Sequence, residues 1–264
     1  MIIGIIGVGR IGSALIKGFL EAKVLDEEQI IANDRGDKKL EALRTIGIQT
    51  DSKNFEVAEK SDAIIIAVKP KDITNVLQEI KEHVQNKLVI SVAAGIRTKL
   101  IEEQIGGKVR VIRVMPNIAC TVREAASVYC VGKYAISYDE KTVRSLFEAV
   151  GTVFKLPEHL MDAVTGLSGS GPAYYFFIIK ALAEAGVNEG IPEEIAIKLA
   201  AQVAIGAGKT VLKETRSLNE LIDMVCSPNG TTIEGLKVLE QGKVAENLKE
   251  AVKKATNRSK ELSK

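Results

Sequence analysis

A GxGxxG pattern lies near the start of the chain, at Gly7-Val8-Gly9-Arg10-Ile11-Gly12. It follows directly on an apolar, strand-like run, Ile2–Gly7, and it precedes a stretch with apolar residues at helical spacing. Glycines at these places permit a tight turn and let the backbone approach a pyrophosphate at the helix N-terminus. A turn without a ligand is the alternative. The strand, turn and helix together predict a dinucleotide-binding turn formed by this pattern and Ile6.

Further apolar, β-branched runs follow, each typical of a strand that is buried on both faces of a parallel sheet: Gln29–Asn33, Ala63–Val68, Leu88–Val92 and Val109–Val114. Amphipathic stretches alternate with them. Two more strand-like segments, Ser127–Val131 and Thr152–Leu156, flank a stretch with one apolar helical face, and we expect them to extend the sheet. The alternation predicts an α/β fold with a doubly wound sheet of the Rossmann type.

Helical periodicity dominates after about Met161, and no strand pattern is evident from Ala173 onward. Prolines stand where helices can begin, at Pro172, Pro192 and Pro228. The last helix is expected from Val244 to about Arg258, with the lysine-rich tail as a frayed, solvated end. We therefore predict a Rossmann domain over residues 1–160 and an all-helical domain over residues 161–264.

Composition excludes several classes of function. A net charge of +2, no Trp and 4% aromatic residues argue against a nucleic-acid-binding protein. Three cysteines without CxxC spacing indicate buried free thiols, with no disulfide framework and no metal site. The N-terminus lacks a basic region, and the most apolar later run, Ala173–Ile179, is shorter than the ~20 residues of a membrane span. We expect a cytoplasmic protein outside the membrane.

An acidic residue stands at the end of the second predicted strand. Asp34 lies 22 residues beyond Gly12, close to the ~20 typical of the carboxylate that binds the adenosine ribose of NAD. Arg35 follows at once, and a guanidinium there would hold the 2′-phosphate of NADP. A plain turn over residues 33–36 fits either role. The sequence leaves the choice between NADH and NADPH open.

Five motifs in order resemble the pyrroline-5-carboxylate reductase family over nearly the whole chain. Three follow predicted strands, where open α/β sheets bind ligands: Ala67-Val68-Lys69-Pro70, Ala93-Ala94-Gly95 and Met115-Pro116-Asn117. Two lie in the helical half: Ser168-Gly169-Ser170-Gly171-Pro172-Ala173 and Ser227-Pro228-Asn229-Gly230-Thr231-Thr232. Ordinary loop chemistry is the alternative for each motif taken singly.

The resemblance implies roles for these residues. The segments 67–70 and 93–95 would line the ribose and nicotinamide, with Asp34 and Asn54 near the adenosine. Met115 and Asn117 would border the nicotinamide ring. Ser227, Gly230, Thr231 and Thr232 would hold the imino acid, with the Thr232 hydroxyl on the ring nitrogen. The family usually has a glycine where this chain has Asn229, so a positive φ is expected there. A simple helix cap at residues 231–232 is the alternative.

The resemblance further implies that NADPH or NADH reduces 1-pyrroline-5-carboxylate to L-proline, in a homodimer built through the helical domain and in rings of such dimers. One rival is a β-hydroxyacid-type dehydrogenase or a reductase of another cyclic imine. The hydroxyacid enzymes need a His or Lys acid/base, but His83 and His159 adjoin no motif and the first lysine after Gly171 is Lys180. A second rival is a non-catalytic NAD(P)-binding regulator, against which Thr232 argues.

Overall fold

The computed structural model describes residues 1–262 of the chain. The chain forms two compact units, which are described separately. The first comprises Met1–Ser170 together with the end of the last helix from Lys254, and the second is Gly171–Lys253. The prediction that residues 161–264 bind substrate and form the oligomer stays a prediction.

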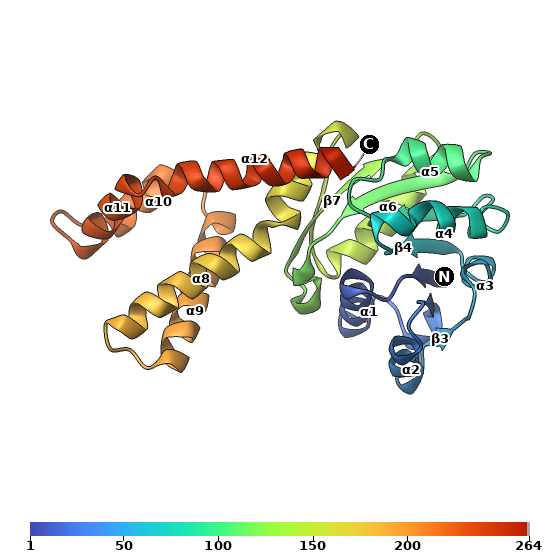
Figure 1. Ribbon diagram of the computed structural model, residues 1–264, viewed down its shortest axis with the longest axis horizontal. Helices are drawn as coiled ribbons and strands as arrows, with labels where there is room; N and C mark the ends of the chain where they lie inside the picture. Colours follow the sequence, from blue (N-terminus) through green and yellow to red (C-terminus); the bar gives the residue numbers. More distant parts are fainter. Residues whose placement is uncertain (263–264) are drawn as a thin grey trace. The chain divides into compact units, whose positions relative to one another are not determined.

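One eight-stranded sheet forms the framework of the first unit (Figure 1). Its strand order is β3-β2-β1-β4-β5-β6-β7-β8. All neighbouring strands are parallel except β6 and β7. The strands are β1 (Ile3–Ile6), β2 (Ile30–Asn33), β3 (Gln49–Thr50), β4 (Ala63–Ile66), β5 (Leu88–Ser91), β6 (Arg110–Met115), β7 (Ala125–Val131) and β8 (Gly151–Lys155). The chain order reverses between β1 and β4, and such a switch point is where doubly wound sheets bind ligands.

Helices cover both faces of this sheet. On one face α1, α2 and α6 pack their apolar sides onto the strands, and on the other face α3, α4 and α5 do so. The central strands are fully buried on both faces, which explains their continuous Ile and Val runs. The helices of this unit are α1 (Arg10–Glu21), α2 (Asp37–Thr45), α3 (Asn54–Lys60), α4 (Ile73–Ile80), α5 (Thr98–Ile105), α6 (Ser137–Glu148) and α7 (Met161–Val164).

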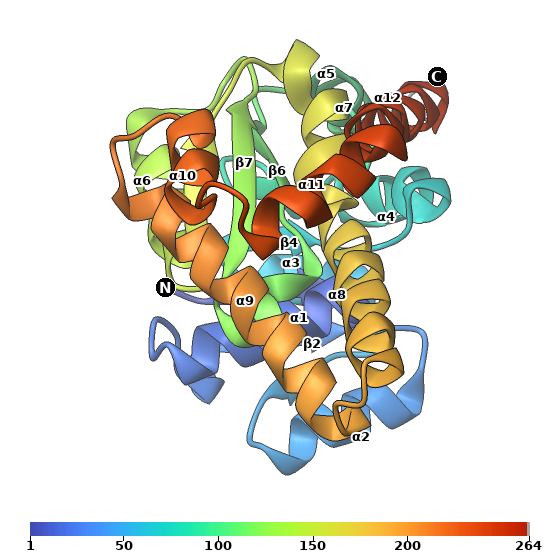
Figure 2. The ribbon, with the colours of Figure 1, turned by 90° about the vertical axis from the view of Figure 1, so that its left-hand side faces the viewer.

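The second unit contains only helices among its described residues. They are α8 (Gly171–Asn188), α9 (Glu193–Lys213), α10 (Leu218–Val225), α11 (Thr231–Gln241) and the first part of α12 (Val244–Leu262). The helices α8 and α9 run side by side, joined by a short turn (Figures 1 and 2). Their contact is made by small residues such as Ala183, Ala196 and Ala200, and most of their large apolar side chains are exposed in the single chain.

The predicted fold class is confirmed, and two details differ. The strand β3 was not predicted, because Gln49 and Thr50 form only a short edge strand without an apolar run. The expectation of a frayed tail was wrong up to Leu262, where α12 ends, and the tail's last two residues lie outside the described residues. Ser259 is buried there, and its hydroxyl donates to Asp162 Oδ1 at 2.7 Å. This partly buried hydrogen bond holds the last turns of the helix.

Candidate active site

The glycine-rich turn joins β1 to α1 at the switch point of the sheet. Gly7 has φ of +100°, and a Cβ there would lie 2.8 Å from the Ala67 backbone. A Cβ on Gly12 would overlap the Gly7 carbonyl oxygen. Both positions therefore require glycine, one for its backbone conformation and the other for close packing of the helix on the turn.

The middle glycine of the pattern, Gly9, leaves space open beside the backbone. A Cβ on Gly9 would meet no atom within 4 Å. Gly9 is the N-cap of α1, and no side chain caps the N–H groups of the first turn. Uncapped N–H groups at a helix N-terminus attract anions. The space and the donors fit the pyrophosphate of a dinucleotide.

Asp34 lies at the carboxyl end of β2, next to this turn. Its carboxylate accepts hydrogen bonds from the Val8 N–H at 2.8 Å and the Gly36 N–H at 2.9 Å, and it pairs with the Lys39 ammonium. Burial alone would raise the pKa of Asp34, but the hydrogen bonds from Gly36, Lys39 and Val8 outweigh it and hold the pKa below its usual value. Asp34 is therefore an anion at neutral pH.

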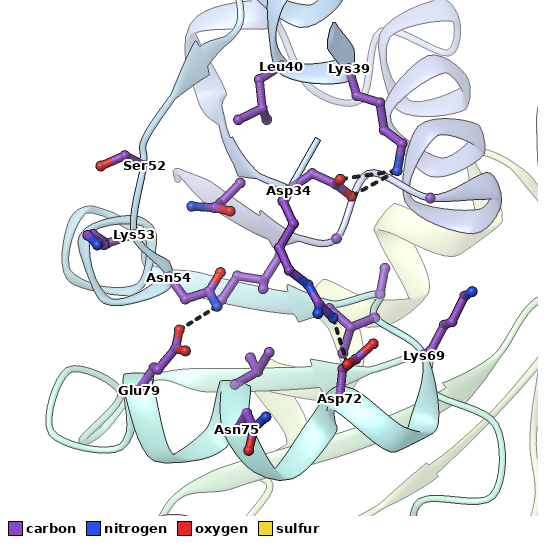
Figure 3. A pocket seen from close by; sticks show the side chains of 18 of the residues that line it. Asp34, Lys39, Leu40, Ser52, Lys53, Asn54, Lys69, Asp72, Asn75 and Glu79 are labelled. Atoms are coloured by element: carbon purple, nitrogen blue, oxygen red, sulfur yellow. Dashed lines mark hydrogen bonds and ion pairs between the residues drawn. The ribbon is translucent and has the colours of Figure 1, made fainter. Parts of the chain in front are cut away.

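A groove of about 930 Å³ runs along the carboxyl ends of β1, β2 and β4 (Figure 3). This is the size of a cleft that takes a large cofactor. Nine of the residues predicted to bind cofactor line it: Ile6, Gly7, Gly9, Asp34, Arg35, Asn54, Ala67, Val68 and Lys69. The fold thus brings residues from four separate segments of the chain together at one groove.

Two polar contacts link the walls of the groove. The Arg35 guanidinium pairs with Asp72 at 2.6 Å, and the Asn54 side-chain amide donates to Glu79 Oε2 at 2.6 Å (Figure 3). Asp72 and Glu79 come from the turn and helix after β4. They and Lys39 were not identified from the sequence, because they belong to no motif and only the fold brings them to the groove.

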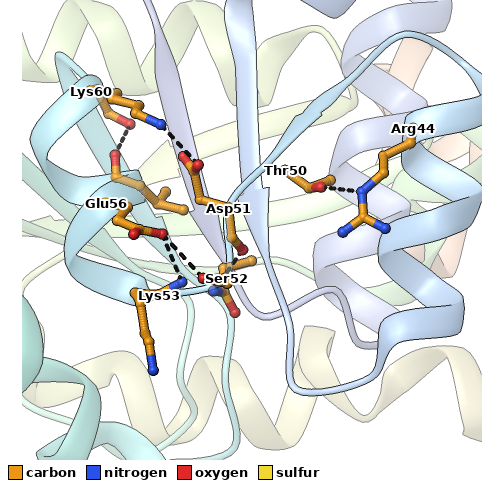
Figure 4. Close-up of polar contacts among 10 residues, drawn as sticks. Arg44, Thr50, Asp51, Ser52, Lys53, Glu56 and Lys60 are labelled. Atoms are coloured by element: carbon orange, nitrogen blue, oxygen red, sulfur yellow. Dashed lines mark hydrogen bonds and ion pairs between the residues drawn. The ribbon is translucent and has the colours of Figure 1, made fainter.

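A polar network fixes the connection that carries Asn54. The Lys53 N–H donates to Glu56 Oε2 at 3.2 Å, and the Lys60 ammonium pairs with Asp51 at 2.8 Å (Figure 4). The backbone oxygen of Asp51 accepts from the Asn33 side chain at 2.9 Å. These bonds tie the start of α3 to β2, so that Asn54 faces the groove.

The other predicted cofactor residues do not line the groove. Val8 is buried, while Arg10, Ile11 and Gly12 form the first turn of α1. Pro70 opens the short helical turn Pro70–Asp72. Ala93, Ala94 and Gly95 follow β5, and Gly95 has φ of +78°. They stand at the same edge of the sheet as the groove, because β5 runs parallel to β4.

Met115 and Asn117, at and just after the end of β6, make contacts within the first unit. The Asn117 side chain accepts from the Ala119 N–H at 3.0 Å and donates to the Ser168 carbonyl at 3.1 Å. The methyl group of Met115 lies so close to Gly169 that a Cβ there would be 2.6 Å away. These contacts join β6 to the segment that leads into α8.

The predicted substrate loop lies in the second unit, before α11. Asn229 has φ of +58°, which confirms the expected positive φ. A Cβ on Gly230 would overlap Ser227 Oγ, so this position also requires glycine. Thr231 opens α11, Thr232 is half-buried in its first turn, and no side chain caps the helix. The loop thus presents uncapped backbone N–H groups beside the Thr232 hydroxyl.

Other reactive side chains stand apart from these features. The exposed His159 lines no part of the groove, and the half-buried His83 stacks on Phe55 with ring centroids 5.4 Å apart. Burial raises the pKa of Cys120 to about 11 and that of Cys130 to about 12, so neither is a thiolate at neutral pH. Within residues 1–262, no group of three His, Cys, Asp or Glu side chains is placed to hold a metal ion.

Family models match both halves of the chain. The model described as pyrroline-5-carboxylate reductase dimerisation matches residues 158–262. The model described as NADP oxidoreductase coenzyme F420-dependent matches residues 2–95.

Relatives match over the full length. The pyrroline-5-carboxylate reductase of Methanosarcina acetivorans is 45% identical over 99% of this chain and 98% of its own, and that of Arabidopsis thaliana is 41% identical over 99% and 95%. The crystal structure of the Plasmodium falciparum pyrroline carboxylate reductase with NADP bound superposes with a TM-score of 0.91 and 32% identity, covering 100% of this chain and 98% of that one. The resemblance in the five motifs is confirmed, and the chain belongs to the pyrroline-5-carboxylate reductase family.

Proposed function

We propose that the protein reduces 1-pyrroline-5-carboxylate to L-proline. The observation that carries this proposal is the full-length match to pyrroline-5-carboxylate reductases, together with a groove shaped for a dinucleotide. When bound there, NADPH or NADH supplies the hydride that reduces the carbon–nitrogen double bond. This chemistry needs no acid/base residue at an alcohol, because the imine can arrive already protonated.

The groove and the N-terminus of α1 bind different parts of the cofactor. Gly9 and the free N–H groups of α1 take the pyrophosphate. Asp34, Arg35 and Asn54 stand at the adenosine end. Residues 67–70 continue along the ribose, and residues 93–95 with Asn117 border the nicotinamide. These assignments follow from the family resemblance, and the placement of the strand ends at one edge of the sheet supports them.

Thr232 orients the substrate in this proposal. The first N–H groups of α11, from Thr231 onward, hold the carboxylate, as free donors at a helix N-terminus do. The Thr232 hydroxyl then contacts the ring nitrogen and keeps the imine carbon in register. It accepts from the protonated imine before reduction and adjusts to the neutral amine afterwards. Ser227 shapes the loop by accepting the Gly230 N–H at its carbonyl, at 2.9 Å.

We also propose a homodimer formed through the helical unit, with rings of dimers as the higher assembly. The matched dimerisation model covers α8 to α12. In the single chain Phe177 of α8 is 73% exposed, and Leu212 of α9 is 80% exposed. Apolar side chains at this exposure on neighbouring helices require cover, which a second copy supplies.

A cytoplasmic location completes the proposal. Among residues 1–262, α9 is the one helix that is long and apolar enough to span a membrane by length and composition. In the proposed dimer the second copy, rather than a membrane, covers the apolar side chains of α9, since α9 lies within the matched dimerisation region. Nucleic acid is not expected as a partner, because the net charge is only +2.

An initial-rate assay tests the proposed reaction. Oxidation of NADPH and of NADH is followed with 1-pyrroline-5-carboxylate, with a six-membered cyclic imine and with a panel of keto acids that correspond to hydroxy acids. The proposal requires the five-membered imino acid to give the highest kcat/KM. Preference for a keto acid would favour the dehydrogenase, and dinucleotide binding without turnover would favour the regulator.

A further inference from the structure

Lys39 is a cation of the groove that belongs to no sequence motif. It is the third residue of α2, and its side chain is 50% exposed. The ammonium lies 3.1 Å from Oδ1 and 3.2 Å from Oδ2 of Asp34 (Figure 3). Lys39 therefore contacts the carboxylate at the end of β2, where this fold meets the adenosine ribose.

This pairing occupies the acceptor sites of Asp34. A carboxylate offers about four such sites. The Val8 N–H takes one on Oδ2, the Gly36 N–H takes one on Oδ1, and Lys39 contacts both oxygens. With Lys39 in place, Asp34 has little capacity left for ribose hydroxyl groups, and its charge is neutralised. The repulsion of a 2′-phosphate by Asp34 is reduced accordingly.

Arg35 is engaged elsewhere. Its guanidinium pairs with Asp72, from the turn after β4, at 2.6 Å. A 2′-phosphate would have to compete with the Asp72 carboxylate for Arg35. Lys39 instead already stands beside Asp34 and, as an ammonium, has three N–H donors to share between the carboxylate and a phosphate.

We propose that Lys39 is the residue that sets the preference between the two dinucleotides, by neutralising Asp34 and binding the 2′-phosphate of NADPH. The proposal rests on the proposed function, because it places the adenosine ribose beside Asp34. Removal of Lys39 leaves Asp34 with an unpaired charge, which repels the 2′-phosphate, and with free acceptors for the two ribose hydroxyls of NADH. Lys39 thus converts an NADH-type carboxylate into a site that accepts NADPH.

The test compares Lys39→Met with Lys39→Arg and with the control Lys38→Met, whose lysine is exposed on the same helix but does not line the groove. Calorimetry gives the Kd for NADP+ and NAD+, and for the fragments adenosine 2′,5′-bisphosphate and 5′-AMP. In Lys39→Met, the Kd for NADP+ and the bisphosphate should rise roughly 10- to 100-fold, as for one lost charge-assisted hydrogen bond. The Kd for NAD+ and 5′-AMP should stay the same or fall.

The two comparison variants and one further variant, Asp34→Ser, sharpen the test. Lys39→Arg keeps the charge and should retain the wild-type selectivity, and Lys38→Met should match the wild type. Asp34→Ser removes the competing carboxylate and should raise the selectivity for NADP+ over NAD+. The relative kcat/KM for NADPH should follow the same order.

Three outcomes overturn the role of Lys39. The ratio of the two dinucleotide Kd values in Lys39→Met could equal that in Lys38→Met, both ligands could weaken equally in Lys39→Met, or Arg35→Met could lose the selectivity instead. A wild-type protein that binds neither dinucleotide would refute the proposed function itself. A wild type that binds both and reduces 1-pyrroline-5-carboxylate, with an unchanged ratio in Lys39→Met, refutes Lys39 alone.

Discussion

The Thr232 hydroxyl stands in the uncapped first turn of α11, beside the N–H groups that we assign to the substrate carboxylate. If it orients the imine nitrogen, Thr232→Ala should lower kcat/KM for 1-pyrroline-5-carboxylate by roughly 10- to 100-fold, equivalent to one hydrogen bond to a charged group. Thr232→Ser should retain most of the activity. The Kd of the cofactor, measured separately, should be unchanged in both variants.

Wild-type kcat/KM in Thr232→Ala would show that the residue does not contact the substrate. Equal loss of thermal stability in the Ala and Ser variants would indicate that Thr232 serves the helix rather than the imine. In either case the substrate site would have to lie elsewhere in the molecule.

Asp34 also has a consequence for stability against acid. Its pKa is lowered in the folded protein, so the carboxylate stabilises the fold above the unfolded-state pKa of about 3.9. That contribution is lost as the pH falls through the lower, folded-state pKa. The wild type should therefore have a larger free energy of unfolding than Asp34→Asn at pH 6, and the difference should shrink as the pH approaches 3. Denaturant unfolding at a series of pH values measures it, and a constant difference would contradict the role of the charge.

At the scale of an element, two glycines of the β1–α1 turn are expected to differ in what they serve, one the fold and the other dinucleotide binding. A Cβ on Gly12 would overlap the Gly7 carbonyl, whereas a Cβ on Gly9 would meet nothing. Gly12→Ala should therefore lower the Tm and dinucleotide affinity together. Gly9→Ala should leave the Tm near the wild-type value and weaken dinucleotide binding, because its methyl group enters the space assigned to the pyrophosphate. Unchanged NADP+ affinity in a stable Gly9→Ala protein would place the pyrophosphate elsewhere.

The elements that sequence patterns predicted are those with strong local signals. The strands β1, β2, β4, β5 and β6 carry buried Ile and Val runs that no helical face explains. The strand β3 has no such run, and it forms because Thr50 pairs with Ala32 of β2. The last turn of α12 depends on the hydrogen bond between Ser259 and Asp162, residues far apart in the sequence. Contacts between residues far apart in the chain produce no periodic pattern in the sequence, so they could not be predicted from it.

The same division applies to the candidate site. The glycine turn was predicted because glycine permits unusual backbone conformations. The positive φ at Asn229 was predicted because the family that the chain resembles usually has glycine there. Charged partners were missed, because Asp72 meets Arg35 only after β2 and β4 flank β1 in the sheet. Lys39 meets Asp34 through the local turn from β2 into α2, which no motif marks. From the sequence alone, Asp34 favoured NADH and Arg35 favoured NADPH. The structure adds the partners of both side chains, Lys39 and Asp72, which change the charge that each presents.

For the whole molecule, the exposed apolar sides of α8 and α9 predict an assembly that is needed for stability. Ile205 on α9 is 49% exposed and Ile46, at the end of α2, is 50% exposed. A substitution of Ile46 is therefore a control for the same substitution of Ile205. Ile205→Glu should shift the protein from dimers or larger species toward monomers and lower its activity, because a charge would be buried in the interface. Ile46→Glu should change neither property.

Light scattering coupled to gel filtration at micromolar concentration measures the mass of each variant. A wild-type protein that is monomeric and fully active would contradict the proposed interface. Equal effects of the two glutamate substitutions would indicate general destabilisation rather than a surface specific to α9.

Transfer of a labelled hydride tests the central proposal most directly. The protein is supplied with NADPH or NADH carrying deuterium at the transferable position of the nicotinamide, together with 1-pyrroline-5-carboxylate, and the product is analysed by mass spectrometry and NMR. The proposed function predicts L-proline with a single deuterium on the former imine carbon, formed in step with cofactor oxidation. Absence of proline, or proline without the label, would contradict it.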